Sequence, residues 1–211
     1  MNKKERAAEI TEKLKELYPN VMCALEYSGQ AWRLLVMGIL SAQCTDRRVN
    51  TVCPALFEKF PSVYDMAAAE IPDIEFYIKS CGLYKTKAKN IKLCCEKIVS
   101  DFGGEIPCDM DSLLSLPGVG RKIANLILGD IYKLPSIVTD THCIRLSARM
   151  GLSAKNEKNP IKTEMALLKI IAKEEQVDFC HRMVLFGREY CTARQPKCNE
   201  CPLFDLCKNK N

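Results

Sequence analysis

Lys122 is the residue of this 211-residue sequence whose type and position first suggest chemistry. It follows the segment LPGVGR at 116–121 and precedes the apolar pattern IANLIL, which is typical of a helix. The positive end of a helix dipole disfavours the ammonium form of a lysine in the first turn and helps to free the amine. A neutral lysine amine is a nucleophile, whereas most lysines are only solvated charges, so both interpretations stay open on this pattern alone.

The turn before this lysine has the outline of a helix-hairpin-helix. Its glycines, Gly118 and Gly120, would let backbone N–H groups face outward at the start of the second helix. A nucleic-acid phosphate fits there whatever the base sequence is. Val119 and Arg121 complete the set of candidate contacts to a DNA backbone. A plain helical corner is the alternative, and the turn by itself favours neither.

Asp140 is the second candidate catalytic group. It stands between two threonines in VTDTH at 138–142, just ahead of an apolar helical stripe, which is the pattern of an N-cap. A carboxylate held at a helix N-terminus stays ionised and could stabilise a developing cation or move protons, so capping and catalysis are compatible. His142 could be either a hydrogen-bonding group at the helix terminus or a substrate contact.

Four cysteines near the C-terminus form a candidate metal centre. They are separated by six, two and five residues, and they are Cys191, Cys198, Cys201 and Cys207. Four thiolates on so short a loop can surround zinc or an iron–sulfur cluster. Zinc sites usually have two close cysteine pairs, and here only the middle two are close, so the spacing favours the cluster over zinc. The residues between them are mostly polar, unlike a core segment.

The chain has no strand leading into a GxGxxG turn, and hence no flavin or nicotinamide fingerprint to supply electrons. This favours a structural centre, with an iron–sulfur redox protein as the alternative. The other nine cysteines, such as Cys53, Cys94 and Cys95, lie on helical patterns and are expected to be small buried hydrophobic residues.

The elements that must position these groups are helices. Apolar residues recur at spacings of three and four, no alternating strand pattern is present, and the sequence therefore predicts an all-α fold. Asp109 or Asp111 would cap a short helix before the turn, and residues 121–132 would form the helix after it. The clearest stripes are Ile10, Leu14 and Leu17; Val49, Val52, Leu56 and Phe57; and Met165, Leu168, Ile171 and Ala172.

Composition and charge narrow the class of protein. The formal net charge of +5 allows an anionic partner without demanding one. The N-terminal segment is too charged for a signal peptide, and the longest uncharged apolar run, at 34–45, is too short to cross a bilayer. We therefore expect an intracellular, cytoplasmic protein with no membrane partner, whose thirteen cysteines are reduced thiols or metal ligands.

Several motifs in one order resemble the endonuclease III family of the helix-hairpin-helix superfamily. They are SAQCTD at 41–46, GLYKTKAKNI at 82–91, LPGVGRK at 116–122, VTDTH at 138–142 and the cysteine loop at 191–207. The resemblance covers nearly the whole chain. Three positions depart from the common pattern, Ile123, Cys143 and Phe186, and these bear on the details of the pocket rather than on the reaction.

The resemblance implies two helical lobes. A six-helix domain would span 24–134 and include the helix-hairpin-helix at about 109–132, while 1–23 and 135–211 would form the iron–sulfur domain. Lys122 matches the nucleophile and Asp140 the catalytic aspartate. Gln43 matches a residue that fills the gap left by an extruded base, and Leu83 one that wedges into the stack. The four loop cysteines match the ligands of a [4Fe-4S] cluster.

The implied activity is that of a bifunctional DNA glycosylase and abasic-site lyase in base excision repair. The partner would be double-stranded DNA with a damaged base or an abasic site, bound by a monomer. Lys122 would attack the sugar, and the resulting Schiff base would lead to β-elimination. Oxidised pyrimidines are the expected substrates, because the mismatch glycosylases of the superfamily usually lack a lysine at this position. A mismatch-type glycosylase and a non-catalytic DNA-binding protein are the alternatives.

Overall fold

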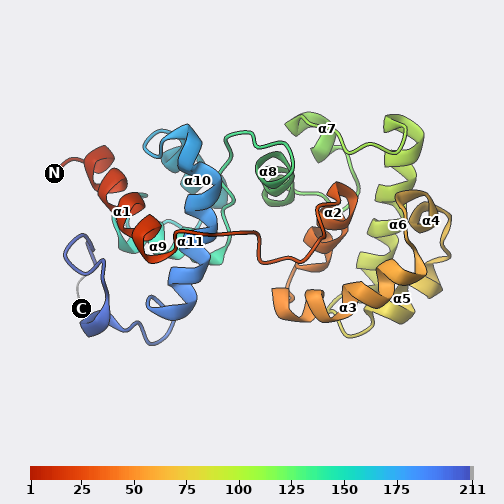
Figure 1. Ribbon diagram of the computed structural model, residues 1–211, viewed down its shortest axis with the longest axis horizontal. Coiled ribbons are helices and arrows are strands. Elements are labelled where there is room, and N and C mark those ends of the chain that lie inside the picture. The colour runs from red at the N-terminus through yellow and green to blue at the C-terminus, as the bar shows by residue number, and fades with distance from the viewer. Residues whose placement is uncertain (210–211) are drawn as a thin grey trace. The chain divides into compact units, whose positions relative to one another are not determined.

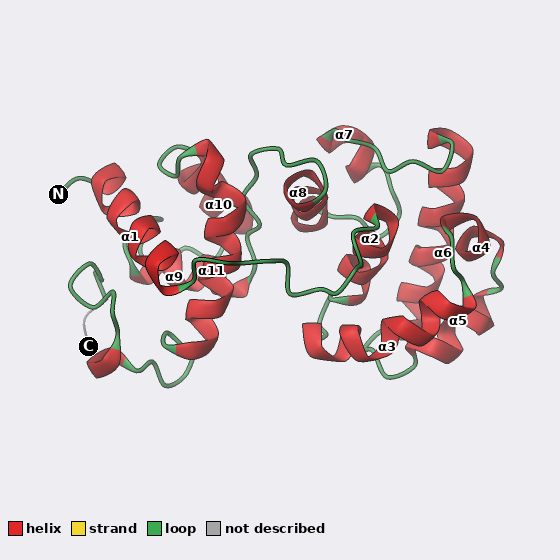
Figure 2. Cartoon of the chain, viewed as in Figure 1, coloured by secondary structure: helices red, strands yellow, loops and turns green. Residues whose placement is uncertain are grey.

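The chain folds into helices joined by short connections, and the residues described contain no strand (Figure 2). The computed structural model describes residues 1–209 of the 211. This confirms the all-α prediction. The helices are α1 Lys3–Leu17, α2 Ala31–Leu40, α3 Asp46–Lys59, α4 Val63–Ala68, α5 Ile71–Ile78, α6 Tyr84–Phe102, α7 Met110–Leu114, α8 Arg121–Asp130, α9 Thr141–Arg149, α10 Pro160–Leu168 and α11 Gln176–Glu189, with the 3₁₀ turns η1 Lys173–Glu175 and η2 Cys198–Glu200.

The helices form two compact units, one made by Ala24–Tyr132 and the other by Met1–Cys23 together with the chain from Lys133 onward. The division falls after Tyr132, where the sequence placed it after residue 134. Tyr132 belongs with the first unit because its hydroxyl donates to the carbonyl of Ile106.

The unit 24–132 is built around α2. Its residues from Leu34 to Leu40 are all buried, because this stretch carries no polar side chain and is stable only when surrounded. A Cβ placed on Gly38 would lie 3.0 Å from Ile123, so a glycine lets α2 approach α8 closely. The unit has seven helices, α2 to α8, where six were expected. The short helix before the turn is α7, and Asp109 caps it by accepting from the Ser112 N–H at 2.9 Å.

The other unit joins the N-terminal helix α1 to α9, α10 and α11 (Figure 1). Arg182 on α11 is 2% exposed and donates to the Tyr18 carbonyl at the end of α1, while its guanidinium pairs with Glu175 at 3.0 Å and Asp178 at 3.2 Å. A buried charge is tolerated because every side of it is paired. The apolar core around it comprises Ala7, Ile10, Leu14, Ile137, Cys143, Leu146, Met150, Leu152, Leu167, Ile171, Phe179, Cys180, Met183, Phe186, Leu203 and Leu206.

The prediction of one apolar helical stripe at 165–172 was wrong in part. The helix ends at Leu168, and Met165 is 39% exposed while Leu167 is buried. The Ile171 N–H closes the last turn on the Leu167 carbonyl at 2.9 Å, so Leu167 and Ile171 share the buried side instead. The helix begins at Pro160, and the Asn159 side chain caps it.

The expectation that the nine remaining cysteines are buried was also wrong in part. Cys108 is exposed, and Cys23 and Cys44 are only half-buried. These three lie in connections between helices, where local apolar periodicity says nothing about burial. The other six, including Cys53, are buried as expected.

Candidate functional site

The hairpin between α7 and α8 is closed by its own backbone. The Val119 N–H donates to the Leu116 carbonyl at 3.1 Å, and the Gly120 carbonyl accepts from Ile123 and Ala124 at 2.9 and 3.0 Å. Gly118 has a φ of +79°, and a Cβ on it would lie 2.9 Å from the Cβ of Asn90 on α6. A glycine is therefore required there for both its backbone conformation and its contact with α6.

Lys122 is exposed at the second position of α8, immediately beyond this turn. Gly120 is the N-cap of α8, makes no side-chain cap, and has nothing within 4 Å of the place where a Cβ would stand. The first-turn N–H groups of a helix have no intrahelical partners, so an open N-terminus of this kind suits a phosphate. Arg121 is half-buried beside it, whereas the side chain of Val119 is buried at 7% exposure and serves the packing of the turn.

Gln43 and Leu83 share an unusual backbone conformation. Both are exposed residues in the left-handed region, with φ of +53° and +59°, and Leu83 is 58% exposed. A bulky residue without glycine's freedom adopts this conformation at a cost of about 1–3 kcal/mol, and such strain collects at functional sites. Sequence patterns could not reveal it, because neither residue is one that usually marks a left-handed turn.

Lys87 holds the Gln43 and Leu83 turns together. Its ammonium lies 2.7 Å from the Leu40 carbonyl at the end of α2, and the side chain is only 4% exposed. Burial lowers the pKa of this lysine below its ordinary value. The Gln43 carbonyl lies 3.6 Å from the position of a Cβ on Gly82. The sequence around Lys87 indicates no role for this lysine, since a buried contact to a carbonyl 47 residues away leaves no local signal.

Asp140 begins α9 in the other unit. Its Oδ1 accepts from the Cys143 N–H at 2.7 Å, and its backbone is extended, as an N-cap requires. Within the described chain Oδ2 has no hydrogen-bond partner. One carboxylate oxygen therefore fixes the helix, and the other can face a ligand.

His142 packs against α11. A Cβ on Gly187 would collide with its Nδ1, so the glycine makes room for the ring. Nδ1 also lies 3.2 Å from Nη2 of Arg145. A guanidinium can only donate, so Nδ1 is the acceptor in this contact. These contacts favour a packing role for His142 within the unit.

Two arginines one turn apart on α9 hold the cysteine loop. Arg145 donates to the Cys191 carbonyl from Nη2 at 2.9 Å, and Arg149 donates to the Thr192 carbonyl at 2.8 Å and to the Cys191 sulfur at 3.2 Å. The Arg149 carbonyl accepts from the N–H of Asn209 at 3.0 Å. Both ends of the loop are therefore fixed to one helix. Sequence reasoning missed both arginines.

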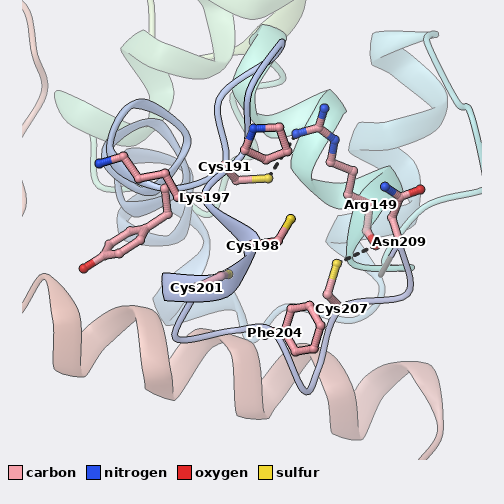
Figure 3. Close-up of a pocket in the computed structure, with 10 residues that line it drawn as sticks. Arg149, Cys191, Lys197, Cys198, Cys201, Phe204, Cys207 and Asn209 are labelled. Carbon is pink, nitrogen blue, oxygen red and sulfur yellow. Dashed lines mark hydrogen bonds between the residues drawn. The ribbon is translucent and has the colours of Figure 1, made fainter. Parts of the chain in front are cut away.

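The four cysteines line one cavity, and in Figure 3 they face a common space between the loop and Arg149. Burial raises the pKa of the Cys201 and Cys207 thiols, and the neighbouring thiols raise it further. Among the described residues no three metal-binding side chains converge closely enough for a single ion. Four thiols around a space wider than one ion fit an iron–sulfur cluster better than zinc.

The hairpin and the cysteine loop each match a known family. Residues 36–173 match the HhH-GPD superfamily base excision DNA repair protein, and residues 191–207 match the iron-sulfur binding domain of endonuclease III. The endonuclease III of Synechocystis sp. is 45% identical over 98% of this chain and 93% of the relative. The chain belongs to the endonuclease III family. The endonuclease III of Bacillus subtilis is 40% identical over 93% of the chain and 89% of the relative.

A solved endonuclease III structure extends the likeness to the fold. It is described as a trapped endonuclease III–DNA covalent intermediate, and it matches with a TM-score of 0.93 at 38% identity over 100% of this chain and 98% of that one. As a member of the endonuclease III family, the protein is a DNA glycosylase and abasic-site lyase with DNA as its partner and a [4Fe-4S] cluster as its cofactor. No helix of the described residues is long and apolar enough to span a membrane.

Proposed function

We propose that this enzyme removes oxidised pyrimidines from duplex DNA and cleaves the strand by β-elimination through a Schiff base on Lys122. The observation that carries the proposal is the exposed position of Lys122 in the first turn of α8, directly after a turn whose glycine backbone can seat a phosphate. Support also comes from the relative described as a trapped covalent intermediate with DNA, since a covalent adduct requires an enzyme nucleophile.

The chemistry follows from these groups. Lys122 Nζ attacks the anomeric carbon of the damaged nucleotide, and the carbon–nitrogen bond to the base breaks. The sugar ring then opens to an imine, which makes the neighbouring C2′ proton acidic. Loss of that proton expels the 3′ phosphate and cuts the strand. Asp140, with one oxygen held by the helix and the other available, would stabilise the cationic sugar or assist the proton transfers.

The remaining groups would bind rather than react. Gln43 and Leu83, both exposed and preset in left-handed turns, would occupy the gap left by the extruded base, which offsets part of the unstacking energy of a few kcal/mol. Gly118, Gly120 and Arg121 would hold the phosphates beside Lys122. The cysteines from Cys191 to Cys207 would ligate the cluster, which holds the loop in its fold. The enzyme would work as a monomer on intracellular DNA.

The substrate class is tested with a panel of duplexes, each carrying one oxidised pyrimidine, one mismatched thymine or one abasic site. We expect base release and strand cleavage on the oxidised pyrimidines and cleavage at the abasic site, with little release of mismatched thymine. Release of mismatched thymine in preference to oxidised pyrimidines would contradict the proposed substrate. Abasic-site binding without cleavage would contradict the proposed lysine chemistry.

A further inference from the structure

Three cysteines outside the metal centre gather beside the Gln43 and Leu83 turns. Beyond the effect of burial, the Cys44 thiol raises the pKa of the Cys81 thiol, and both raise the pKa of the Cys53 thiol, so the three lie near one another. All three are free thiols. None of them takes part in the reaction proposed above.

The two turns that carry Cys44 and Cys81 lie backbone to backbone. The Gln43 carbonyl faces Gly82 at 3.6 Å from where a Cβ would stand, a contact independent of the cysteine side chains. Each turn closes tightly, with the Cys44 N–H on the Ser41 carbonyl at 3.2 Å and the Cys81 N–H on the Ile78 carbonyl at 2.8 Å. A bond between the two sulfurs would therefore join two turns that already lie side by side.

The three thiols differ in how an oxidant can reach them. Cys44 is half-buried, whereas Cys53 and Cys81 are each 1% exposed. Burial raises the pKa of the Cys81 thiol to about 11, opposed by the charges of Lys87 and Arg48. Cys44 is therefore the point of entry, and Cys81 is a protected thiol placed to resolve whatever forms on Cys44.

We propose that Cys44 and Cys81 form a reversible disulfide that joins the two turns and switches off DNA processing when disulfide oxidants accumulate. The Cys44 thiolate attacks a small disulfide such as oxidised glutathione, forming a mixed disulfide and releasing one glutathione thiol. The Cys81 sulfur then attacks the Cys44 sulfur and releases the second. Two protein thiols are oxidised, one glutathione disulfide is reduced, and the two protons leave with the two glutathione molecules.

The consequence for function follows from the neighbours of the two sulfurs. A disulfide holds its sulfurs at about 2.05 Å, well inside the roughly 3.5–4 Å of a non-bonded contact, so the turns must shift. Gln43 precedes Cys44 directly, and Leu83 follows Cys81 by two residues, both in strained left-handed conformations. The shift therefore reaches both residues. This effect rests on the DNA contacts proposed for Gln43 and Leu83, whereas the formation of the bond does not.

Metal binding explains this group of thiols less well than disulfide formation does. In the part of the chain that the structure describes, no three His, Cys, Asp or Glu side chains are placed to hold a single metal ion. The ammonium of Lys87 lies among the neighbours of Cys44 and Cys81 and would repel a cation. Two thiols beside a lysine suit oxidation better than metal binding.

The test treats the cluster-loaded enzyme with graded ratios of oxidised to reduced glutathione. Free thiols are alkylated, peptides are mapped by mass spectrometry, and the visible absorbance of the cluster is followed throughout. We expect a Cys44–Cys81 peptide, with cleavage of abasic-site DNA lowered at least tenfold and restored by dithiothreitol. Cys44→Ser and Cys44→Ala should keep full activity in the oxidant. Cys108→Ala, which removes an exposed thiol elsewhere, should stay sensitive.

The other possible outcomes would contradict either the switch or the proposed function. Glutathione that remains on Cys44 without transfer to Cys81 would overturn it, because the resolving thiol would then be out of reach. A mapped disulfide with unchanged cleavage would overturn the link to function. An enzyme that fails to cleave abasic-site DNA even when reduced would count against the proposed function, while the peptide map would still decide whether the disulfide forms.

Discussion

We expect Asp140 to serve both as the N-cap of α9 and as the catalytic carboxylate of the proposed reaction. Its Oδ1 caps α9 through the Cys143 N–H, which leaves Oδ2 and the negative charge for the proposed reaction. Asparagine caps helices about as well as aspartate, whereas alanine does not. The two roles can therefore be separated by two substitutions at the same position.

Asp140→Asn is expected to leave the free energy of unfolding within about 0.5 kcal/mol of the parent and to lower base release by roughly 10²–10⁴-fold. Asp140→Ala should lose comparable activity and in addition about 1 kcal/mol of stability, because the N-cap is gone. Urea unfolding and single-turnover base release measure the two effects. Full activity in the Asn variant would assign Asp140 to the fold alone.

Gly118 and Gly120 lie in the same turn, so alanine substitutions at the two positions can be compared as test and control. Gly118→Ala places a Cβ at a φ of +79° and 2.9 Å from the Asn90 Cβ, and we expect a loss of roughly 1–3 kcal/mol of stability together with weaker binding of abasic-site DNA. Gly120→Ala meets nothing within 4 Å, and its stability should change by only a few tenths to about 1 kcal/mol. Equal destabilisation in urea unfolding would contradict the packing described for the turn.

At the scale of elements, α9 connects the candidate aspartate at its start to the cysteine loop at its end. Arg149 donates to two carbonyls of the loop and to the Cys191 sulfur, and its own carbonyl accepts from the far end of the loop. An N–H donor at a cluster ligand stabilises negative charge on sulfur. The helix is thus the support on which the loop is folded.

Arg149→Met should therefore loosen the loop and speed the loss of the cluster in air. We expect a several-fold shorter lifetime of the visible iron–sulfur absorbance. Arg194→Met is the control, since Arg194 is exposed in the same loop and, among the described residues, has no hydrogen bond to the cysteines. Equal lifetimes for the two variants would mean that the loop does not depend on Arg149.

The elements were predictable from the sequence to the extent that their signals are local. The hairpin follows from Gly118 and the apolar stripe of α8, and the start of α9 follows from Asp140. The contacts of Lys87 and Arg149 were not predictable, because their partners lie 47 and 42 residues away and depend on tertiary packing. The left-handed turns at Gln43 and Leu83 were missed because glycine is the usual sign of that conformation.

At the scale of the whole molecule, each unit has a core of its own, and only one contains the cysteine loop. Structural metal centres contribute directly to folding, so the loop from Cys191 to Cys207 should depend on the cluster far more than the helices of 24–132 do. The prediction of two units came from the family resemblance, because the amino-acid composition does not change at the boundary after Tyr132.

Removal of the iron by a chelator under oxidising conditions should open the cysteine loop first. Limited proteolysis is expected to cut within 191–207 at least tenfold faster than in the cluster-loaded enzyme, while a fragment close to 24–132 stays protected. Mass spectrometry of the fragments measures this directly. Early cuts within α2 or α6 would contradict the independence of that unit's core.

The most direct test of the account is borohydride trapping on abasic-site DNA, which reduces a Schiff base to a stable bond. We predict a covalent adduct for the parent enzyme that maps to Lys122, and its loss in Lys122→Ala. Arg121→Ala, which removes the neighbouring charge and keeps the amine, should still trap at saturating DNA. An adduct that persists undiminished in Lys122→Ala, or none with the intact enzyme, would contradict the assignment of the nucleophile.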